Sequence, residues 1–392
     1  MTVAPLRFTC LEERKGQRDL LKQLFPRIAE VTWLLAPPLG WRDYPQSEAR
    51  AWEAYDRRKT PAATGVMRRL KQRLLKWQYN GARRYFEANK ACVAVAWNAQ
   101  AGNRYVFMQA ARDAGVKRLF LELGPFPGTL TADPCGVNFV NGLPREIAPY
   151  LEWRRTTPSA EPGWRSLAQT IRQRAAAGEV KPSAADVPPL EAPYVFAPLQ
   201  TPGDSQLRLF GGEHRSVEAF VRALVRASHA LPAGWHLRLK EHPTAPGSLA
   251  EFITREARGS RVVLDNQTDT FAQVRAARAV VTVNSSVGLE AMGFDKPVIA
   301  TGQCFWAFDG VAHHAPGDAE LAQLFATADT LSFDATARDA FLGFLFEEYY
   351  PRLRRPDSPE IDLSAELAKL TLRLDPPAGH PIWARPCKDL SA

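Results

Sequence analysis

The sequence predicts a protein of two α/β domains, each built on a parallel β-sheet, and three observations support this. The chain has 392 residues, and domains usually run to about 100–200 residues, so two is the natural count. Hydrophobic residues make up 45% of the chain and charged residues 23%, as in ordinary globular proteins. Short apolar segments alternate with helical patterns in two separate series, which is typical of βαβ units.

The first series predicts an N-terminal Rossmann-like domain over residues 1–157. Its expected strands and helices are Val31–Ala36, Ser47–Glu87 (helix), Cys92–Trp97, Tyr105–Ala114 (helix) and Lys117–Leu123. Gly115 follows the second helix as a C-cap. In the long helix, Leu70, Leu74, Trp77 and Tyr85 are spaced to share one apolar face.

The second series predicts a C-terminal Rossmann-like domain over residues 194–340. A proline-rich linker at 158–193 precedes it, and a helical tail at 341–392 is expected to cross back onto the first domain. The expected strands are Tyr194–Leu199, Trp235–Lys240, Val262–Leu264, Ala279–Val283 and Pro297–Thr301. The expected helices are Ser166–Ala177 in the linker, then Ser216–Ala230, Leu249–Ala257, Asp269–Ala277 and Val287–Phe294. These strands are apolar throughout, as expected where helices cover both faces of a sheet.

The chain is basic, with a formal net charge of +8 and a pI of about 9.3. Much of the excess lies in Arg57–Arg84. Such a segment is either a solvated helix face or a surface for an anionic partner: membrane lipid, acidic glycan or nucleic acid. No zinc-finger, RNA-recognition or helix-turn-helix motif accompanies it, so nucleic acid is the weakest of the three.

The cysteines and the N-terminus bear on the expected compartment. Five scattered cysteines form no C-x-x-C pair: Cys10, Cys92, Cys135, Cys304 and Cys387. We therefore expect neither a disulfide framework nor a structural zinc site. The N-terminus lacks the apolar segment of a signal peptide, and no apolar run approaches the roughly 20 residues that span a bilayer. The expected location is the cytoplasm.

The strongest local motif is Val280–Gly302, in which an apolar strand runs into a helix that begins near Val287. Small hydroxyl residues at such a helix start cap it and leave backbone N–H groups that attract a phosphate. Gly288 would permit close approach of a ligand, and Glu290 would reach a ribose or base hydroxyl. The candidate residues are Asn284, Ser285, Ser286, Gly288 and Glu290. The alternative is a plain helix cap in a βαβ unit.

Two further strand ends of the second domain carry polar residues. In LKEHP, Lys240 and His242 lie two positions apart and so point the same way, forming a cationic spot that suits a phosphate or a sugar carboxylate. Asp204 lies in a Pro-Gly turn between Gln200 and Gln206, where a carboxylate would serve as a base or nucleophile. The alternatives are a surface lysine with a solvated histidine, and an ordinary turn.

The first domain offers an acid at a strand end. Glu122 ends an apolar strand and precedes a loop rich in glycine and proline, while Asn98 and Arg104 lie at the end of the neighbouring strand. An acid placed above a cleft is a catalytic candidate. The alternative is an edge residue that caps the loop.

These motifs occur in one order, and in that order they resemble the bacterial capsule-polysaccharide synthesis family, which includes retaining β-Kdo (3-deoxy-manno-octulosonic acid) transferases of capsule and O-antigen assembly. The matching segments, within residues 92–305, are WNAQAGNR, FLELGPFPGTL with GVN and LPR, PLQTPGDSQ, KEHP and NSSVGLEAMGFDKPV. The loop after Glu122 reads GPFPG, where other members carry an aromatic residue and an arginine. The acceptor is therefore left open.

The resemblance implies a GT-B fold, with two Rossmann-like domains facing across a cleft, and retaining transfer from CMP-Kdo through a covalent glycosyl-enzyme. It implies no cofactor and no metal ion, and no D-x-D metal motif occurs in a suitable place. Retention by two inversions needs a nucleophile and a separate proton-transfer group. The implied catalytic residues are Asp204 as nucleophile, Glu122 as acid/base, and His242. The implied donor-nucleotide residues are Lys240, Asn284, Ser285, Ser286, Gly288 and Glu290, and the implied substrate-binding residues are Asn98, Arg104, Gln200 and Gln206.

Two other functions stay open. One is a UDP-sugar transferase or epimerase of the same fold, and the other is a non-catalytic component of polysaccharide assembly or export. The expected partners are a nucleotide-sugar donor and a glycan or glycolipid acceptor, with no nucleic acid. The basic helix at residues 66–86 adds a peripheral contact with anionic membrane, which places the cytoplasmic protein at the inner membrane.

Overall fold

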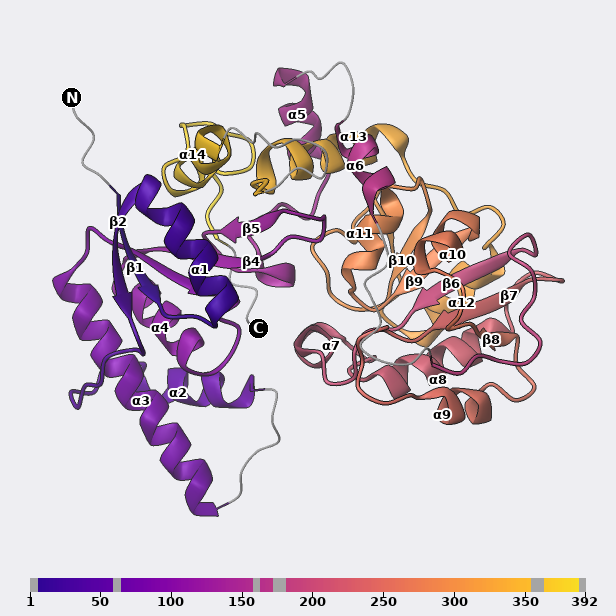
Figure 1. Ribbon diagram of the computed structural model, residues 1–392, viewed down its shortest axis with the longest axis horizontal. Helices are drawn as coiled ribbons and strands as arrows, with labels where there is room; N and C mark the ends of the chain where they lie inside the picture. The colour runs from indigo at the N-terminus through magenta and orange to yellow at the C-terminus, as the bar shows by residue number, and fades with distance from the viewer. Residues whose placement is uncertain (1–5, 59–64, 158–162, 172–180, 354–362, 388–392) are drawn as a thin grey trace. The chain divides into compact units, whose positions relative to one another are not determined.

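The computed structural model describes residues 6–58, 65–157, 163–171, 181–353 and 363–387. The chain forms two compact units, shown in Figure 1. The first unit comprises Met1–Gly124, Gly128–Leu143 and Tyr349–Ala392, and the second comprises Pro125–Pro127 and Pro144–Glu348. After the second unit, the chain returns to the first for its last segment.

The first unit contains a five-stranded sheet of order β2-β1-β3-β4-β5. Its strands are β1 (Leu6–Leu11), β2 (Ala29–Leu34), β3 (Val93–Trp97), β4 (Lys117–Leu123) and β5 (Leu130–Asp133). All pairs are parallel except β4 with β5. The helices are α1 (Lys15–Leu24), α2 (Ser47–Asp56), α3 (Gly65–Ala88), α4 (Gly102–Asp113) and α14 (Leu363–Leu374), with short 3-10 turns at Phe25–Arg27 and Asn138–Val140. The sequence pattern missed β1 and β5.

The long predicted helix is α2 and α3, and the apolar face predicted for it is largely the exposed one. The residues of α3 that enter the core include Leu75, Tyr79 and Phe86, all buried. Leu70 is 52% exposed and Leu74 is 44% exposed. The helix has two apolar faces, and α2 and α4 cover the face opposite to the predicted one.

The second unit contains a six-stranded sheet of order β11-β10-β9-β6-β7-β8, parallel throughout. Its strands are β6 (Tyr194–Pro198), β7 (His236–Lys240), β8 (Val262–Leu264), β9 (Ala279–Thr282), β10 (Val298–Ala300) and β11 (His313–His314). Its helices are α5 (Ala148–Thr156), α6 (Gly163–Thr170), α7 (Ser205–Phe210), α8 (Val217–Ser228), α9 (Ala250–Glu256), α10 (Thr270–Ala276), α11 (Ser286–Met292), α12 (Asp318–Ala326) and α13 (Ala335–Phe344), continued by a π-helical turn at Leu345–Tyr349. Every predicted strand of this series is present.

Residues 144–157, expected in the first domain, belong to the second unit. The reason is aromatic packing between α5 and α13: Tyr150 meets Phe341 edge-on at 5.1 Å, and Trp153 meets Phe344 at 5.2 Å between ring centroids. The predicted linker helix begins as α6, and its second half falls at 172–180, outside the described residues. Among the residues that are described, no helix is both long and apolar enough to cross a bilayer.

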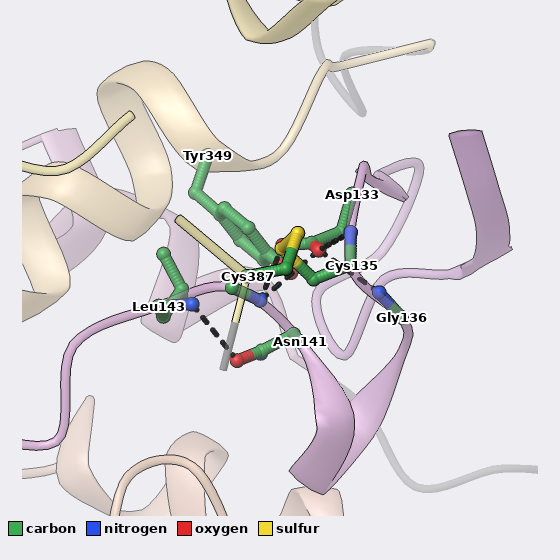
Figure 2. The surroundings of a disulfide bond; sticks show 8 residues. Asp133, Cys135, Gly136, Asn141, Leu143, Tyr349 and Cys387 are labelled. Atoms are coloured by element: carbon green, nitrogen blue, oxygen red, sulfur yellow. Dashed lines mark hydrogen bonds between the residues drawn. A yellow bond between two sulfur atoms is a disulfide. The ribbon is translucent and has the colours of Figure 1, made fainter. Parts of the chain in front are cut away.

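The expectation that no disulfide forms is wrong, because Cys135 and Cys387 are bonded (Figure 2). Cys135 follows β5 and Cys387 lies in the C-terminal segment, 252 residues away. Beside the bond, the fully buried Asp133 accepts hydrogen bonds from the backbone N–H groups of Cys135 and Gly136, and from the Tyr349 hydroxyl at 3.2 Å. The last segment is thus fixed to the first unit by covalent and polar contacts together.

Candidate functional site

Three neighbouring strands of the second unit end at one pocket. β9, β6 and β7 lie side by side and run parallel, so the loops that follow them meet at one sheet edge, the usual ligand position in open α/β sheets. The pocket measures about 590 Å³ including its open mouth. Its lining residues are Pro198, Leu199, Lys240, Glu241, His242, Pro243, Thr270, Phe271, Ser285, Ser286, Val287 and Glu290. The structure thereby joins two motifs that are far apart in the sequence.

Lys240 lines this pocket, yet most of its N–H donors are already bonded within the protein. The side chain is only 3% exposed, and its ammonium donates to the carbonyl oxygens of Asn266 and Thr268, each at 2.7 Å. Burial lowers the pKa of this lysine. An ammonium has three N–H donors, so at most one remains for a ligand. The cationic spot predicted from LKEHP is therefore in part a structural support for the loop after β8.

His242 presents a donor rather than an acceptor to its surroundings. Its Nδ1 accepts the backbone N–H of Thr244 at 3.2 Å and lies 3.0 Å from the Thr244 hydroxyl. A neutral imidazole that accepts at Nδ1 carries its proton on Nε2. An Nε2–H donor at the edge of a pocket suits a phosphate or carboxylate oxygen.

Glu241, between these two residues, was missed by the sequence reading. It is 5% exposed and accepts hydrogen bonds from the Ser248 hydroxyl at 2.9 Å, the Leu249 backbone N–H at 2.6 Å and the Asn266 amide at 2.8 Å. This carboxylate fixes the loop that carries His242. The available signal in the sequence was an acid between Lys240 and His242 at the end of an apolar strand. The structure buries this acid, and a charge is buried only where partners surround it.

Asp204 caps α7 and is connected to Asn284 through Gln200. Asp204 Oδ1 accepts the Gln206 backbone N–H at 2.9 Å, and Oδ2 accepts Gln200 Nε2 at 3.3 Å. The same Nε2 donates to Asn284 Oδ1 at 3.0 Å, and Gln200 Oε1 accepts the Asn284 backbone N–H at 3.3 Å. Asn284 Nδ2 donates to the Gln206 carbonyl at 3.0 Å. Asp204 itself does not line the pocket, but this network holds it to Asn284, whose neighbour Ser285 does.

Asn284 and Gln200 therefore have roles different from the ligand contacts that the resemblance implies. Both side-chain amides are engaged with the protein, so they orient the strand end and Asp204. Gln206 takes part through its backbone N–H and carbonyl groups.

The helix start predicted near Val287 is confirmed, but Gly288 has another reason to be glycine. Ser285 is the N-cap of α11, and its hydroxyl accepts the Val287 backbone N–H at 3.3 Å. A Cβ on Gly288 would lie 2.5 Å from Cη2 of Trp306, whose side chain is 2% exposed. Gly288 does not line the pocket, whereas the buried Glu290 does. The group that approaches Gly288 closely is therefore the Trp306 indole ring.

In the first unit, the end of β4 is joined to the end of β3 by the side chain of Glu122. Its Oε1 accepts the Trp97 indole N–H at 3.0 Å, and its Oε2 accepts Asn98 Nδ2 at 2.7 Å. Asn98 has a φ of 60°, in the left-handed region that only glycine and a few polar residues enter readily. Such backbone strain gathers at functional sites, and here it places the asparagine amide on the acid.

Arg104 is paired with Glu13, a residue that the sequence reading missed. The Arg104 guanidinium forms an ion pair with Glu13, whose side chain is fully buried. Glu13 Oε1 also accepts the Trp97 backbone N–H at 3.1 Å. Burial raises the pKa of Glu13, and the positive charge of Arg104 opposes that rise. The signal was present in LRFTCLEE, an apolar segment followed by acids, but β1 had not been predicted.

Comparison with known proteins shows which protein family this chain resembles. Residues 163–343 match the family model described as capsule polysaccharide biosynthesis protein. FixF of Sinorhizobium fredii is 30% identical over 257 residues, which cover 66% of this chain and 60% of FixF. The capsule polysaccharide export protein KpsS of Escherichia coli is 26% identical over 130 residues, which cover 32% of this chain and 33% of KpsS. The chain thus spans less than two thirds of either relative.

Among solved structures, the β-Kdo 2,7 transferase KpsC of Thermosulfurimonas dismutans is similar, with a TM-score of 0.50 and 13% sequence identity. The match covers 93% of this chain and 98% of that chain. At this identity the likeness shows the fold, and the predicted GT-B class of two Rossmann-like domains is confirmed. Residues 163–343 thus match the capsule polysaccharide biosynthesis family, which supports the resemblance that the sequence motifs indicate.

Proposed function

We propose that this protein is a retaining glycosyltransferase that moves β-Kdo from CMP-Kdo to a glycan or glycolipid of a bacterial surface polysaccharide. The observation that carries the proposal is the pocket at the ends of β9, β6 and β7, where His242, Ser285, Ser286 and Glu290 meet. Hydroxyls and an imidazole donor suit a nucleotide phosphate and a sugar carboxylate. The family match and the fold shared with the β-Kdo transferase KpsC support this choice of sugar.

In the proposed reaction, Asp204 attacks the anomeric carbon of Kdo, and the bond from that carbon to the CMP phosphate oxygen breaks. The acceptor hydroxyl then attacks the glycosyl-aspartate, losing its proton to Glu122, and the Asp204 carboxylate is regenerated. Two inversions give net retention. The support from this chain is the orientation of each acid: Gln200 and Gln206 hold Asp204, and Trp97 and Asn98 hold Glu122.

The remaining roles follow from chemistry. His242 and the remaining N–H of Lys240 are proposed to contact the Kdo carboxylate or the phosphate. Ser285, Ser286 and Glu290 are proposed to hold CMP, while Asn284 acts by positioning Asp204. We propose that the reaction uses no metal ion or cofactor and takes place on the cytoplasmic side of the inner membrane.

The decisive variant is Asp204→Asn, because asparagine caps a helix as well as aspartate does but is a poor nucleophile. We expect CMP release from CMP-Kdo to fall on the order of 10³-fold or more, with the folded state retained. The matched control is Asp334→Asn, the same change at the N-cap of α13, which should keep normal turnover. Mass spectrometry of the parent enzyme given donor alone should detect a Kdo adduct on Asp204. Near-normal turnover of Asp204→Asn would remove it as the nucleophile.

A second candidate is a non-catalytic component of polysaccharide export, which the name of the relative KpsS favours. Such a protein would bind glycan without turnover and without a response to CMP. An absence of CMP release from CMP-Kdo across glycan and glycolipid acceptors, together with unchanged melting in CMP, would favour this candidate over the transferase.

A further inference from the structure

Exposed apolar side chains gather in one part of the first unit. Among the described residues, only two large exposed hydrophobic side chains, Leu123 and Leu151, lie outside residues 35–74. Within that stretch Leu35 is 85% exposed and Trp41 is 69% exposed. Single exposed apolar residues need no explanation, but a concentration of them marks an interaction surface.

The helix α3 carries the larger share of this surface. At about 100° per residue, Val66, Met67, Leu70 and Leu74 fall within an arc of about 100°, and all four are exposed. The opposite face of the helix already supplies the core. A helix that only needed to pack on one side would be polar on the other, so the second apolar face calls for a partner. Figure 1 shows α3 at the edge of the first unit, its N-terminal turns reaching past α2.

The loop at residues 35–41 is fixed beside α3 and extends the same surface. The Gly40 backbone N–H donates to the Trp77 carbonyl at 2.9 Å, and Trp41 packs edge-on against the Trp77 ring at 4.8 Å between centroids. A Cβ on Gly81 would lie 2.1 Å from the Pro38 carbonyl oxygen, so loop and helix are in close backbone contact. Trp41 is therefore held outward in a preformed arrangement.

The charge around this surface indicates the kind of partner that would bind it. Residues 65–86 of α3 contain seven basic and no acidic side chains, and Arg69 and Arg73 are exposed on the same helix. Asp43 and Glu48, which lie beside it, both pair with Lys76, at 2.8 and 3.5 Å. Apolar side chains with tryptophan, bordered by arginine and lysine, fit the boundary between headgroups and acyl chains of an anionic bilayer.

We propose that residues 35–41 and the N-terminal half of α3 form a membrane-docking surface for anionic lipid. Trp41, Leu70 and Leu74 enter the interfacial layer, and Arg69 and Arg73 bind lipid phosphates. The surface lies apart from the pocket of the second unit in sequence, and docking does not depend on which sugar the enzyme transfers.

The test is flotation of the full chain with vesicles of phosphatidylglycerol and phosphatidylethanolamine, compared with phosphatidylcholine alone. We expect binding to the anionic vesicles that weakens as salt rises. Leu70→Gln with Leu74→Gln should lower the partition coefficient about tenfold or more. Arg69→Gln with Arg73→Gln should lower it about 10- to 30-fold and flatten the salt dependence. Brominated lipid should quench parent fluorescence more than that of Trp41→Phe.

Matched variants in the second unit control for surface changes in general. Leu151→Gln and the pair Arg255→Gln with Arg258→Gln alter exposed residues and should leave binding unchanged. Equal binding to neutral and anionic vesicles, or full binding by the Leu70 and Leu74 variant, would overturn the proposal. So would a dimer in sedimentation that the same variant converts to monomer, since a second copy would then cover the surface. None of these outcomes depends on transferase activity.

Discussion

Gly288 and Trp306 show at the scale of single residues how a motif can serve packing. A methyl group on Gly288 would lie 2.5 and 2.6 Å from two ring carbons of the buried Trp306. Overpacking of this kind costs about 1–3 kcal/mol, and alanine in a helix returns up to about 1 kcal/mol. We therefore expect Gly288→Ala to lower the free energy of unfolding by about 1–2 kcal/mol, measured by urea denaturation.

The control for this prediction is Gly16→Ala, because nothing lies within 4 Å of a Cβ at Gly16 and the change should be neutral or slightly stabilising. Trp306→Phe combined with Gly288→Ala should recover part of the loss, since the shorter ring vacates the contact. An unchanged stability of Gly288→Ala would contradict the packing role of this glycine.

Among the elements, the C-terminal segment depends on its bond to the loop after β5. Loss of a native disulfide commonly costs about 2–4 kcal/mol, so Cys387→Ser should lower the free energy of unfolding of the oxidised protein by about that amount. A thiol reagent under denaturing conditions should count three free thiols before reduction, those of Cys10, Cys92 and Cys304, and five after it.

Reducing agent serves as the control for that bond. It should lower the melting temperature of the parent to that of Cys387→Ser and leave the variant unchanged. Five thiols in freshly isolated protein would contradict the bond. The bond is at odds with the proposed cytoplasmic side of the membrane, because cytosolic thiols are kept reduced.

The same elements show what the sequence could and could not predict. Strands covered on both faces are continuously apolar, so β6, β7 and β9 and the polar residues at their ends were predicted within a residue or two. β1 was missed because Arg7 and Thr9 interrupt its apolar pattern, and Glu13 was missed with it. The Cys135–Cys387 bond joins segments 252 residues apart, which spacing alone does not reveal. Periodicity found an apolar face on α3 but not which of two faces is buried.

For the whole molecule, the division of the chain predicts where a nucleotide acts. The pocket lies wholly within the second unit, which is built almost entirely from one continuous segment, Pro144–Glu348. The first unit holds Glu122 and Glu13 and takes its strands and last helix from the two ends of the chain. Donor binding and acceptor chemistry are therefore proposed to belong to different units of the chain.

This separation leads to a prediction for CMP binding to the intact chain. A ligand that binds only the folded state at 100 times its Kd adds about 2.7 kcal/mol of stability, so CMP should raise the melting temperature, and UDP should not. In hydrogen exchange, protection should appear in peptides that contain His242 and Ser285–Glu290, and not in those around Glu122. His242→Ala should weaken CMP binding about tenfold, because it removes the Nε2–H donor. The control His229→Ala, at an exposed histidine after α8, should bind normally. Protection by UDP in place of CMP would point to a UDP-sugar enzyme, because the same pocket would then be selecting a different base.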